Sequence, residues 1–317
     1  MKLSLVIPCY NEEKNVRLMY DAILASLQEK EYKEQVEIVF VNDGSRDCTR
    51  QVLHELHREK QGELHMKVID FSRNFGKESA IYAGLSHATG DYITIIDADL
   101  QQRPEIALEM VDILDTHPEY DCVAAYQAER KEGKVLTFFK DCFYKIINKM
   151  ADITFIQGAS DFRTMRRKMV DAVLSLPEYH RFSKGIFSWV GFETYYMPYE
   201  VQERANGTTK WNFWKLFKYA IGGIVSFTTA PLHMATILGA ISSALAALYL
   251  IVVVIQKLFF GMGLPGYPTI VALILFMGGV QLMVLGVLGE YMAKVYVEGK
   301  NRPIYIARDV LTYEEEK

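Results

Sequence analysis

Two aspartates one residue apart, Asp97 and Asp99, are the residues of this chain best suited to chemistry. They follow an apolar run at residues 92–96, which is typical of a short buried strand. Carboxylates at a strand end are hard oxygen ligands for Mg²⁺ or Mn²⁺, and such a metal can neutralise the charge of a departing nucleotide diphosphate. The simpler alternative is a solvated turn in which Asp99 or Gln101 caps the helix after Pro104. The motif alone does not decide between the two.

The composition sets the class of protein. The chain has 317 residues, 50% of them hydrophobic, which is enough for a sizeable core and two regions. Its net charge of −4 gives no reason to expect a nucleic acid partner. The 4 cysteines form no Cys-x-x-Cys pair, which favours a reducing compartment over a disulfide framework or a zinc site. The first apolar run is too short for a signal peptide, so residues 1–210 are expected to stay where they are made.

Strand and helix patterns alternate over the first 126 residues. Strands are predicted at residues 3–7, 36–41, 66–69, 92–96 and 122–125, with helices at 16–27, 49–59, 77–86 and 105–116. This alternation predicts an α/β fold with a mainly parallel sheet covered on both faces. Ligands of such sheets bind beyond the carboxyl ends of the strands, where the polar segments 8–11, 42–45 and 97–99 fall. The pattern therefore predicts a nucleotide site at that edge.

Two further segments follow strands and carry groups that can meet a nucleotide. Asp43 can accept hydrogen bonds from a ribose or base, whereas helix capping suffices to explain Asp47 and Thr49. Arg73 and Lys77 can approach phosphates, although Lys77 also fits a solvated position in the first turn of a helix.

The last third of the chain is much more apolar. Residues 234–256 and 258–289 contain no charged residue, and each run is long enough to cross a bilayer core of about 30 Å. A buried hairpin in a large soluble core is the disfavoured alternative. Basic residues flank the pair of runs, whereas only Lys257 lies between them, so both termini are predicted to be cytoplasmic. The flanking basic residues are Lys215, Lys218, Lys294, Lys300, Arg302 and Arg308.

Four regions follow from these patterns. We expect a catalytic domain at residues 1–210, an amphipathic interfacial helix at 211–230, two transmembrane helices within 231–295 (about 233–257 and 267–292), and a cytoplasmic tail at 296–317. The aromatic and lysine residues of the second region also fit a helix packed on the soluble domain. Gly278, Gly279 and Gly286 could pack helices in a homo-oligomer or reflect ordinary membrane composition.

With these segments assembled, the chain resembles glycosyltransferase family 2, in the branch of polyprenyl-phosphate sugar transferases. The resemblance is carried by residues 6–13 (VIPCYNEE), 41–45 (VNDGS), 72–77 (SRNFGK), 97–101 (DADLQ), 161–163 (DFR), 204–211 (RANGTTKW), 226–232 (SFTTAPL), 289–291 (GEY) and 300–305 (KNRPIY). It implies a GT-A fold, an inverting mechanism and a divalent metal.

The resemblance also implies roles for individual residues. It places Pro8, Tyr10, Glu12 and Asp43 on the nucleotide, Asp97 beside the donor sugar, and Asp99 with Gln101 on the metal. Arg204 and Lys210 are expected to meet the acceptor phosphate. Relatives often carry an arginine directly after the fifth strand, where this chain has Tyr126 and Gln127, and Arg130 can supply that charge.

The chemistry of two phosphates adds two more candidates. A lipid phosphate is largely dianionic at neutral pH, so it needs positioning and charge neutralisation rather than a strong base. Arg163 is expected to help neutralise it, together with Arg130, Arg204 and Lys210. Asp161 is expected to orient a reactant or act as a base, although helix capping or pairing with Arg163 also fits it.

The leading hypothesis is transfer of one glucose from UDP-glucose to undecaprenyl phosphate at the inner (plasma) membrane, for cell-envelope glycosylation. N-acetylglucosamine, mannose or an aminopentose fit the same motifs. A processive synthase is disfavoured because none of Trp189, Trp211 and Trp214 follows an arginine, as a Gln-x-x-Arg-Trp segment requires. A non-catalytic membrane scaffold is disfavoured by the intact Asp97 and Asp99, and a soluble nucleotidyltransferase by the two apolar runs.

Overall fold

One mixed sheet organises the globular part of the molecule. The computed structural model describes residues 2–28, 35–60, 63–127, 148, 159–200, 228–260 and 266–312. Its 8 strands are arranged in the order β7-β5-β6-β4-β1-β2-β3-β8. The strands are β1 (Leu3–Cys9), β2 (Val36–Asn42), β3 (His65–Phe71), β4 (Tyr92–Ile95), β5 (Cys122–Gln127), β6 (Ala159–Arg166), β7 (Thr194–Tyr199) and β8 (Ala307–Leu311).

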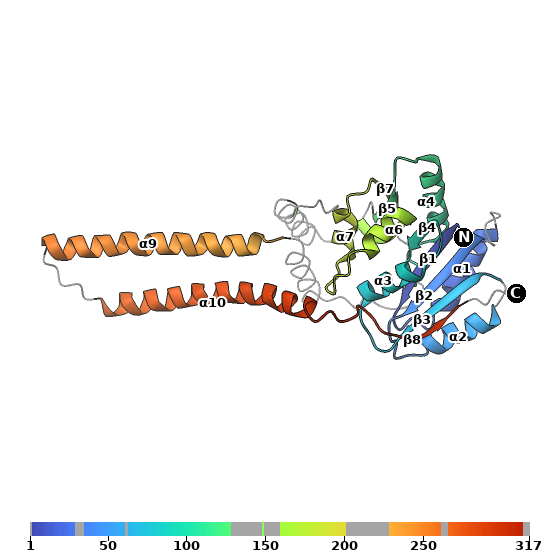
Figure 1. The fold of residues 1–317 in the computed structure, drawn as a ribbon, viewed down its shortest axis with the longest axis horizontal. Coiled ribbons are helices and arrows are strands. Elements are labelled where there is room, and N and C mark those ends of the chain that lie inside the picture. Colours follow the sequence, from blue (N-terminus) through green and yellow to red (C-terminus); the bar gives the residue numbers. More distant parts are fainter. Residues whose placement is uncertain are drawn as a thin grey trace.

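The helices fall into two groups, those that cover the sheet and those of a long hairpin (Figure 1). Covering the sheet are α1 (Val16–Gln28), α2 (Thr49–Glu59), α3 (Lys77–His87), α4 (Pro104–Thr116), α6 (Arg167–Leu174) and α7 (Ser183–Trp189). The hairpin consists of α9 (Ala230–Phe260) and α10 (Tyr267–Glu298).

Two apolar cores form because the sheet is buried on both faces. Met19, Leu53 and Met110, from α1, α2 and α4, pack on one face with Phe40 of β2. On the other face, side chains of α3, α6 and α7 form the second core together with Val39 of β2, and Phe187 of α7 belongs to it. Strands buried on both sides are mostly apolar, which is why residues 36–41, apart from Glu37, lack strict alternation. The predicted α/β sheet is confirmed.

The sheet departs from simple strand-helix alternation at both ends. The predicted strands and helices of the first 126 residues all form, and the central strands β4, β1, β2 and β3 are parallel. However, β6 inserts between β4 and β5 and runs antiparallel to both. β5 therefore pairs with β6 and, in parallel, with β7 rather than lying next to β4.

The chain after the hairpin returns to the sheet. Strand β8 pairs antiparallel with β3, from Val68↔Leu311 to Phe71↔Ala307. Part of the predicted cytoplasmic tail is thus an edge strand of the globular domain. This pairing satisfies the exposed hydrogen-bonding groups of β3, which would otherwise form an open sheet edge.

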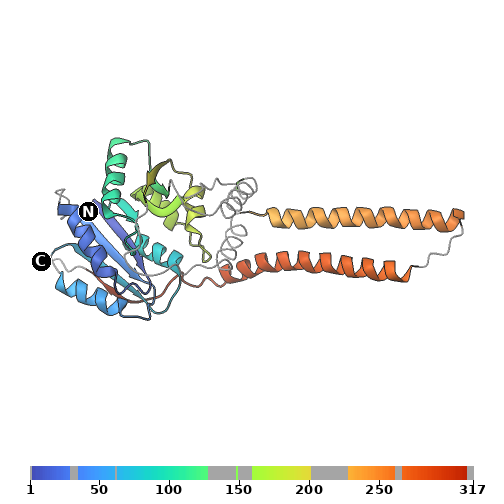
Figure 2. The same ribbon diagram turned by 180° about the vertical axis from the view of Figure 1, so that it is seen from behind.

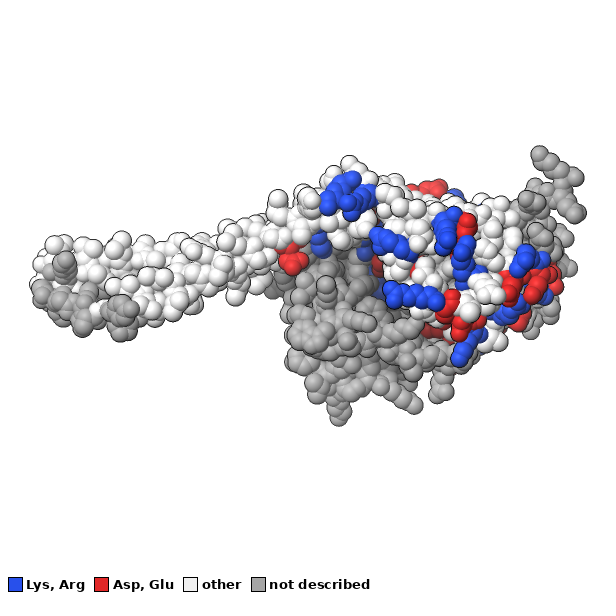
Figure 3. All heavy atoms as spheres, turned by 90° about the horizontal axis from the view of Figure 1, so that it is seen from below, with Lys and Arg blue, Asp and Glu red and all other residues white. Residues whose placement is uncertain are grey.

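The hairpin helices lie side by side and project from the globular part in both ribbon views (Figures 1 and 2). The most apolar windows within residues 230–256 and 269–298 each have a mean hydropathy of 2.5, and 6% and 0% of these windows are buried. On the face seen in Figure 3, charged side chains gather on the globular part and are absent from most of the hairpin. These helices are long and apolar enough to cross a membrane. A buried hairpin in a soluble core does not describe them, because Leu258, Leu275 and Leu282 are exposed.

Candidate active site

The carboxyl ends of four parallel strands bring the predicted motifs to one edge of the sheet. Cys9 at the end of β1 pairs with Asn42 at the end of β2, and Asn42 pairs in turn with Asp70 of β3. β4 runs parallel to β1 on its other side, and residues 97–101 follow β4 directly. The segments after β1, β2, β3 and β4 therefore share one edge, as the sequence predicts for a nucleotide site.

The loops after β1 and β2 hold each other in place. The backbone N–H of Asn11 donates to Oγ of Ser45 (3.0 Å), and the side-chain oxygen of Asn11 accepts the N–H of Arg46 (2.9 Å). The N–H of Glu12 donates to the hydroxyl of Thr49 (2.8 Å). Asp47 accepts the N–H of Thr49 at the start of α2 (3.1 Å), although the N-cap position itself is Cys48, which makes no side-chain cap.

Asp43 holds the loop after β3. It is 3% exposed, and its carboxylate accepts the backbone N–H groups of Phe75 (2.6 Å) and Gly76 (3.1 and 3.0 Å). Burial raises the pKa of Asp43 to about 6, although these N–H groups and the charge of Arg73 act in the opposite direction. Gly44 permits this approach, because a Cβ there would lie 2.3 Å from the backbone carbon of Arg73. Asp43 thus fixes the segment that leads into Lys77, in addition to any contact with a nucleotide.

Lys77 joins two carboxylates at the centre of the edge. Its ammonium lies 2.7 Å from Oδ1 of Asp97 and 3.2 Å from Oδ2 of Asp161, which comes from β6. Burial would raise the pKa of Asp161, but the positive charges of Lys77, Lys184 and Arg163 lower it to about 2. Asp161 is therefore a carboxylate at neutral pH. Its expected partner Arg163 is replaced by Lys77, and it caps no helix.

The loop that carries Asp97 and Asp99 is fixed by the residue after Gln101. Gln102 is 5% exposed, and its side-chain oxygen accepts the N–H of Asp97 (2.9 Å). Leu100 adopts a left-handed conformation (φ 62°), which turns the chain between Asp99 and Gln101. Oδ1 of Asp99 accepts the N–H of Gln101 (3.2 Å), whereas α4 begins at Pro104 without a side-chain cap. The alternative that Asp99 or Gln101 caps this helix is not observed.

The donor atoms of this loop fit a divalent cation. Within the described residues, no group of three or more His, Cys, Asp and Glu side chains surrounds a metal position. Asp97 and Asp99 offer carboxylate oxygens on one half-buried loop, and the Asp97 side chain is 32% exposed. Mg²⁺ commonly takes one or two protein carboxylates and completes its shell with substrate phosphates and water. Two carboxylates therefore suit a metal that arrives with a nucleotide diphosphate.

Arg163 lies inside the protein rather than at the phosphate-facing surface expected for it. It is 5% exposed, its guanidinium carbon lies 4.0 Å from the ring centroid of Phe187, and Nη2 donates to the carbonyl of Ser160 (3.0 Å). The reason is its position in β6, between β4 and β5, where α7 covers the side chain. The positive charge of Arg163 nevertheless influences the site, because it helps to lower the pKa of Asp161.

The other predicted site residues divide into two sets. Pro8 is the one half-buried residue of β1, and Tyr10 and Glu12 are half-buried just beyond that strand. Arg73 is exposed, with its guanidinium carbon 4.0 Å from the ring centroid of Phe75. Arg130, Arg204 and Lys210 lie outside the described residues, as does the predicted interfacial helix up to residue 227.

Sequence reasoning missed Gln102, Ser160 and Glu78. Gln102 also contacts the hydroxyl of Ser160 (3.4 Å), and Glu78 accepts the N–H of Ser183 (2.9 Å). The only signal in the sequence is their adjacency to Gln101, Asp161 and Lys77.

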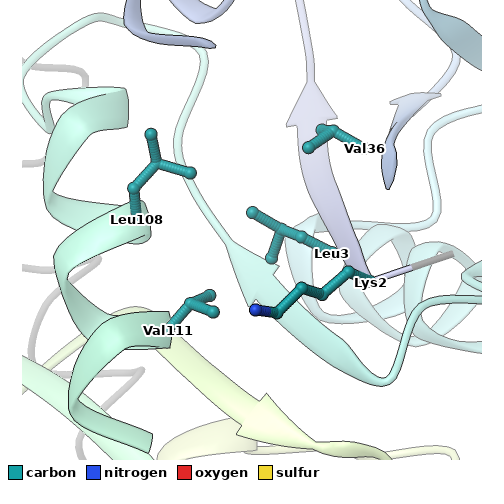
Figure 4. Close-up of a pocket in the computed structure, with 5 residues that line it drawn as sticks. All are labelled: Lys2, Leu3, Val36, Leu108 and Val111. Atoms are coloured by element: carbon teal, nitrogen blue, oxygen red, sulfur yellow. The ribbon is translucent and has the colours of Figure 1, made fainter. Parts of the chain in front are cut away.

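A small apolar hollow lies at the opposite edge of the sheet (Figure 4). Lys2, Leu3, Val36, Leu108 and Val111 line it. Leu3 and Val36 begin β1 and β2, so this hollow is remote from the carboxyl ends of the strands. It has no part in the site.

Comparison with known proteins decides the family. The profile of Glycosyl transferase family 2 matches residues 4–174, which include every described motif of the carboxyl edge. The chain belongs to glycosyltransferase family 2. Its core is the GT-A fold.

Relatives of this family 2 protein match it over nearly its full length. An uncharacterized glycosyltransferase of Synechocystis is 42% identical over 311 residues, covering 98% of this chain and 96% of that protein. The SfII prophage-derived bactoprenol glucosyl transferase of Shigella flexneri is 40% identical over 309 residues, covering 97% and 98%. Among solved structures, the mannosyltransferase PcManGT of Pyrobaculum calidifontis, in complex with GDP-Man and Mn²⁺, is similar with a TM-score of 0.45 and 16% identity, covering 92% of this chain and 87% of that one.

Proposed function

We propose that this glycosyltransferase transfers one glucose from UDP-glucose to undecaprenyl phosphate, with inversion at the anomeric carbon. The observation that carries the proposal is the full-length match to the bactoprenol glucosyl transferase of Shigella flexneri, which spans the site and the apolar hairpin alike. A lipid acceptor also explains why a nucleotide-sugar site is joined to helices that can cross a membrane.

The acceptor phosphate is the nucleophile. As a dianion it needs no strong base, and one of its oxygens forms a bond to the anomeric carbon. The bond from that carbon to the oxygen of the nucleotide diphosphate breaks, and the diphosphate leaves with the electron pair. A single in-line displacement inverts the anomeric centre. The protein must therefore position two anions and offset their repulsion.

The described residues supply part of this positioning. Lys77 brings a positive charge between Asp97 and Asp161, close to where the sugar and the departing phosphate are expected. Asp161 is held as a carboxylate and can orient the sugar by accepting hydrogen bonds from its hydroxyls. Asp43 orders the loop from Asn74 to Gly76, which precedes Lys77. We propose that Arg204, Lys210 and Arg130 meet the phosphates directly.

Asp99 and Gln101 are proposed to hold Mg²⁺ or Mn²⁺ with the donor, and Asp97 is proposed to lie beside the donor sugar. Such a metal would neutralise charge on the departing diphosphate. Gln102 fixes the backbone of the loop at residues 97–101, so the carboxylates of Asp97 and Asp99 are held in a defined arrangement before the donor binds.

We propose a membrane location with the catalytic domain and both termini in the cytoplasm. β1 and β8 belong to the same sheet, although they precede and follow the hairpin in the sequence. The chain must therefore cross the membrane an even number of times between them, which supports two crossings. Lys294, Lys300 and Arg302 at the globular end of α10 agree with the positive-inside rule.

The decisive experiment uses purified protein in detergent with undecaprenyl phosphate, Mg²⁺ or Mn²⁺, and a panel of radiolabelled nucleotide sugars. We expect label from UDP-glucose in the lipid phase, and none after EDTA. Label from another sugar would correct the donor. If no donor labels the lipid while nucleotide binding is intact, the proposal is wrong and a non-catalytic scaffold is favoured.

A further inference from the structure

The last residue of α10 is bonded to a loop of the catalytic domain. The carboxylate of Glu298 accepts the backbone N–H of Tyr179 (3.0 and 3.2 Å) and that of His180 (3.2 Å). Tyr179 and His180 belong to residues 175–182, which join α6 to α7 and are called here the α6–α7 loop. The end of a helix long enough to span a membrane is thus tied to the domain that holds the site.

The position of Glu298 is unfavourable for the helix itself. A helix C-terminus carries partial negative charge, so a cation is favoured in the last turn and a carboxylate is disfavoured. α10 nevertheless ends on Glu298 and has no basic residue in its last turn. A residue that breaks a local rule requires a compensating contact, and the two N–H groups of the α6–α7 loop supply it.

The far end of the α6–α7 loop reaches the active site. Ser183, the first residue of α7, donates its N–H to Glu78 (2.9 Å) and its hydroxyl to the same carboxylate. Glu78 follows Lys77 in the first turn of α3, and Lys77 contacts Asp97 and Asp161. The α6–α7 loop is therefore linked to the carboxylates of the site through the contact of Ser183 with Glu78 and through Lys77, the neighbour of Glu78.

The loop between these two contacts is internally braced. Arg181 is 8% exposed, its guanidinium carbon lies 4.5 Å from the ring centroid of Tyr82 in α3, and it donates to the carbonyls of Leu176 and Val173. A braced loop passes a displacement from one end to the other instead of absorbing it.

The base of the hairpin is also closed. The hydroxyl of Tyr291 in α10 donates to the carbonyl of Thr228 just before α9 (2.6 Å). Beyond α10, Tyr305 stacks on Phe71 with ring centroids 4.9 Å apart, and its hydroxyl lies 3.2 Å from Nε2 of His87 at the end of α3. Glu298 lies between these two anchors in the sequence, so three contacts join the end of the hairpin to its surroundings.

We propose that Glu298 is a positioning residue that sets the site at the depth of a membrane-bound acceptor phosphate. This inference rests on the proposed function. The phosphate of a long polyprenyl lipid is confined to the headgroup layer, whereas the donor diffuses in water. Loosening the α10 contact therefore weakens encounter with the lipid acceptor and leaves donor binding unchanged.

The test compares two acceptors in liposomes. For Glu298→Ala we expect kcat/KM for undecaprenyl phosphate to fall about tenfold, as expected for losing hydrogen bonds to a charged group. The KM for the donor should not change. With a short-chain, water-soluble polyprenyl phosphate, which is not confined to one depth, the loss should be less than about twofold. Glu298→Gln keeps an acceptor oxygen and should recover most of the activity.

The matched control is Glu193→Ala, which removes an exposed glutamate of the catalytic domain remote from α10 and should leave both acceptors unaffected. Unchanged transfer to undecaprenyl phosphate in Glu298→Ala, or an equal loss with both acceptors, would overturn the proposal. So would unfolding of both Glu298 variants, because the residue would then serve stability alone. Failure of the wild-type protein to glycosylate either acceptor would instead overturn the proposed function.

Discussion

The ammonium of Lys77 lies 2.7 Å from Oδ1 of Asp97, so the first carboxylate of the Asp-x-Asp loop already has a cationic partner from the protein itself. The same ammonium reaches Asp161 at 3.2 Å. Three segments, after β3, after β4 and in β6, are thereby joined by one side chain. Lys77 is the first residue of α3 and its side chain is 45% exposed, yet its contacts with two carboxylates give it an electrostatic role at the site.

Replacing Lys77 by methionine removes the charge and keeps the length of the side chain. We expect kcat to fall about a hundredfold, the scale for losing one preorganised electrostatic contact. The pKa of Asp161 should rise, because Lys77 is the strongest of the charges that lower it. The acid limb of the pH–rate profile should therefore move to higher pH, and Lys77→Arg should restore part of the rate. An unchanged profile would contradict this role.

Asp99→Ala tests the metal assignment. We expect transfer to fall by about a thousandfold, because the donor diphosphate loses a ligand of its charge-neutralising cation. Membrane insertion and the melting temperature should stay near those of the wild type, since Asp99 lies on a loop rather than in a core. Turnover close to normal, with the same sensitivity to EDTA, would show that Asp99 does not hold the metal.

Asp43 should make stability depend on pH. Its folded-state pKa of about 6 lies above the ordinary carboxyl value, so its contribution is fully present below the unfolded pKa and is lost as pH rises through 6. Relative to Asp43→Asn, the wild-type protein should therefore be more stable at pH 5 than at pH 7.5, by about 1 kcal/mol. Melting temperatures of both proteins at the two pH values measure this difference. A difference of the opposite sign would contradict the raised pKa.

Arg50 should stabilise the attachment of β8. Asp70 and Asp309 face each other across β3 and β8, and Arg50 contacts both carboxylates, with Nε 3.5 Å from Asp70. Like charges opposite each other destabilise a sheet, so Arg50→Met should lower the free energy of unfolding by about 1–2 kcal/mol. Adding Asp309→Asn should recover part of that loss, and thermal melting of the single and double variants measures the coupling. If the effects of Arg50→Met and Asp309→Asn on the free energy of unfolding were strictly additive, Arg50 would not act through Asp309.

Arg204→Ala tests the division between donor and acceptor residues. The residue lies outside the described part of the structure, so this prediction rests on the sequence. We expect transfer to the lipid to be lost while nucleotide binding persists, because the arginine is proposed to meet the acceptor phosphate alone. Titration of UDP-glucose onto the variant separates the two steps. An equal loss of donor affinity would place Arg204 on the nucleotide instead.

Local patterns predicted the first half of the fold well. Apolar runs such as residues 36–41 and helical spacing such as that of residues 49–59 gave strands and helices at or near the observed bounds, because burial on one or both faces dictates residue type directly. The same patterns missed β6, β7 and β8. β6 carries Asp161 and Arg163, and β8 carries Arg308 and Asp309, so polar residues obscured their strand character.

The candidate site was predicted by residue type, but not by contact. Asp97, Asp161 and Lys77 were each identified from their motifs, yet nothing in the spacing of residues 77, 97 and 161 states that one ammonium joins both carboxylates. Arg163 was expected at a phosphate, whereas the insertion of β6 between two strands buries it under Phe187. Strand order is a long-range property, and it determines which side of the sheet a side chain faces.

The sequence by itself determined the family, the carboxyl-edge motifs and two helices apolar enough to cross a membrane, since each depends on residues close together in the chain. Only the tertiary structure decided that the chain after α10 returns as β8 and that Glu298 bonds to Tyr179, a residue 119 positions away. Such contacts depend on how the sheet and the hairpin pack. Every residue except proline has a backbone N–H, so residue type does not reveal which distant carboxylate that N–H donates to.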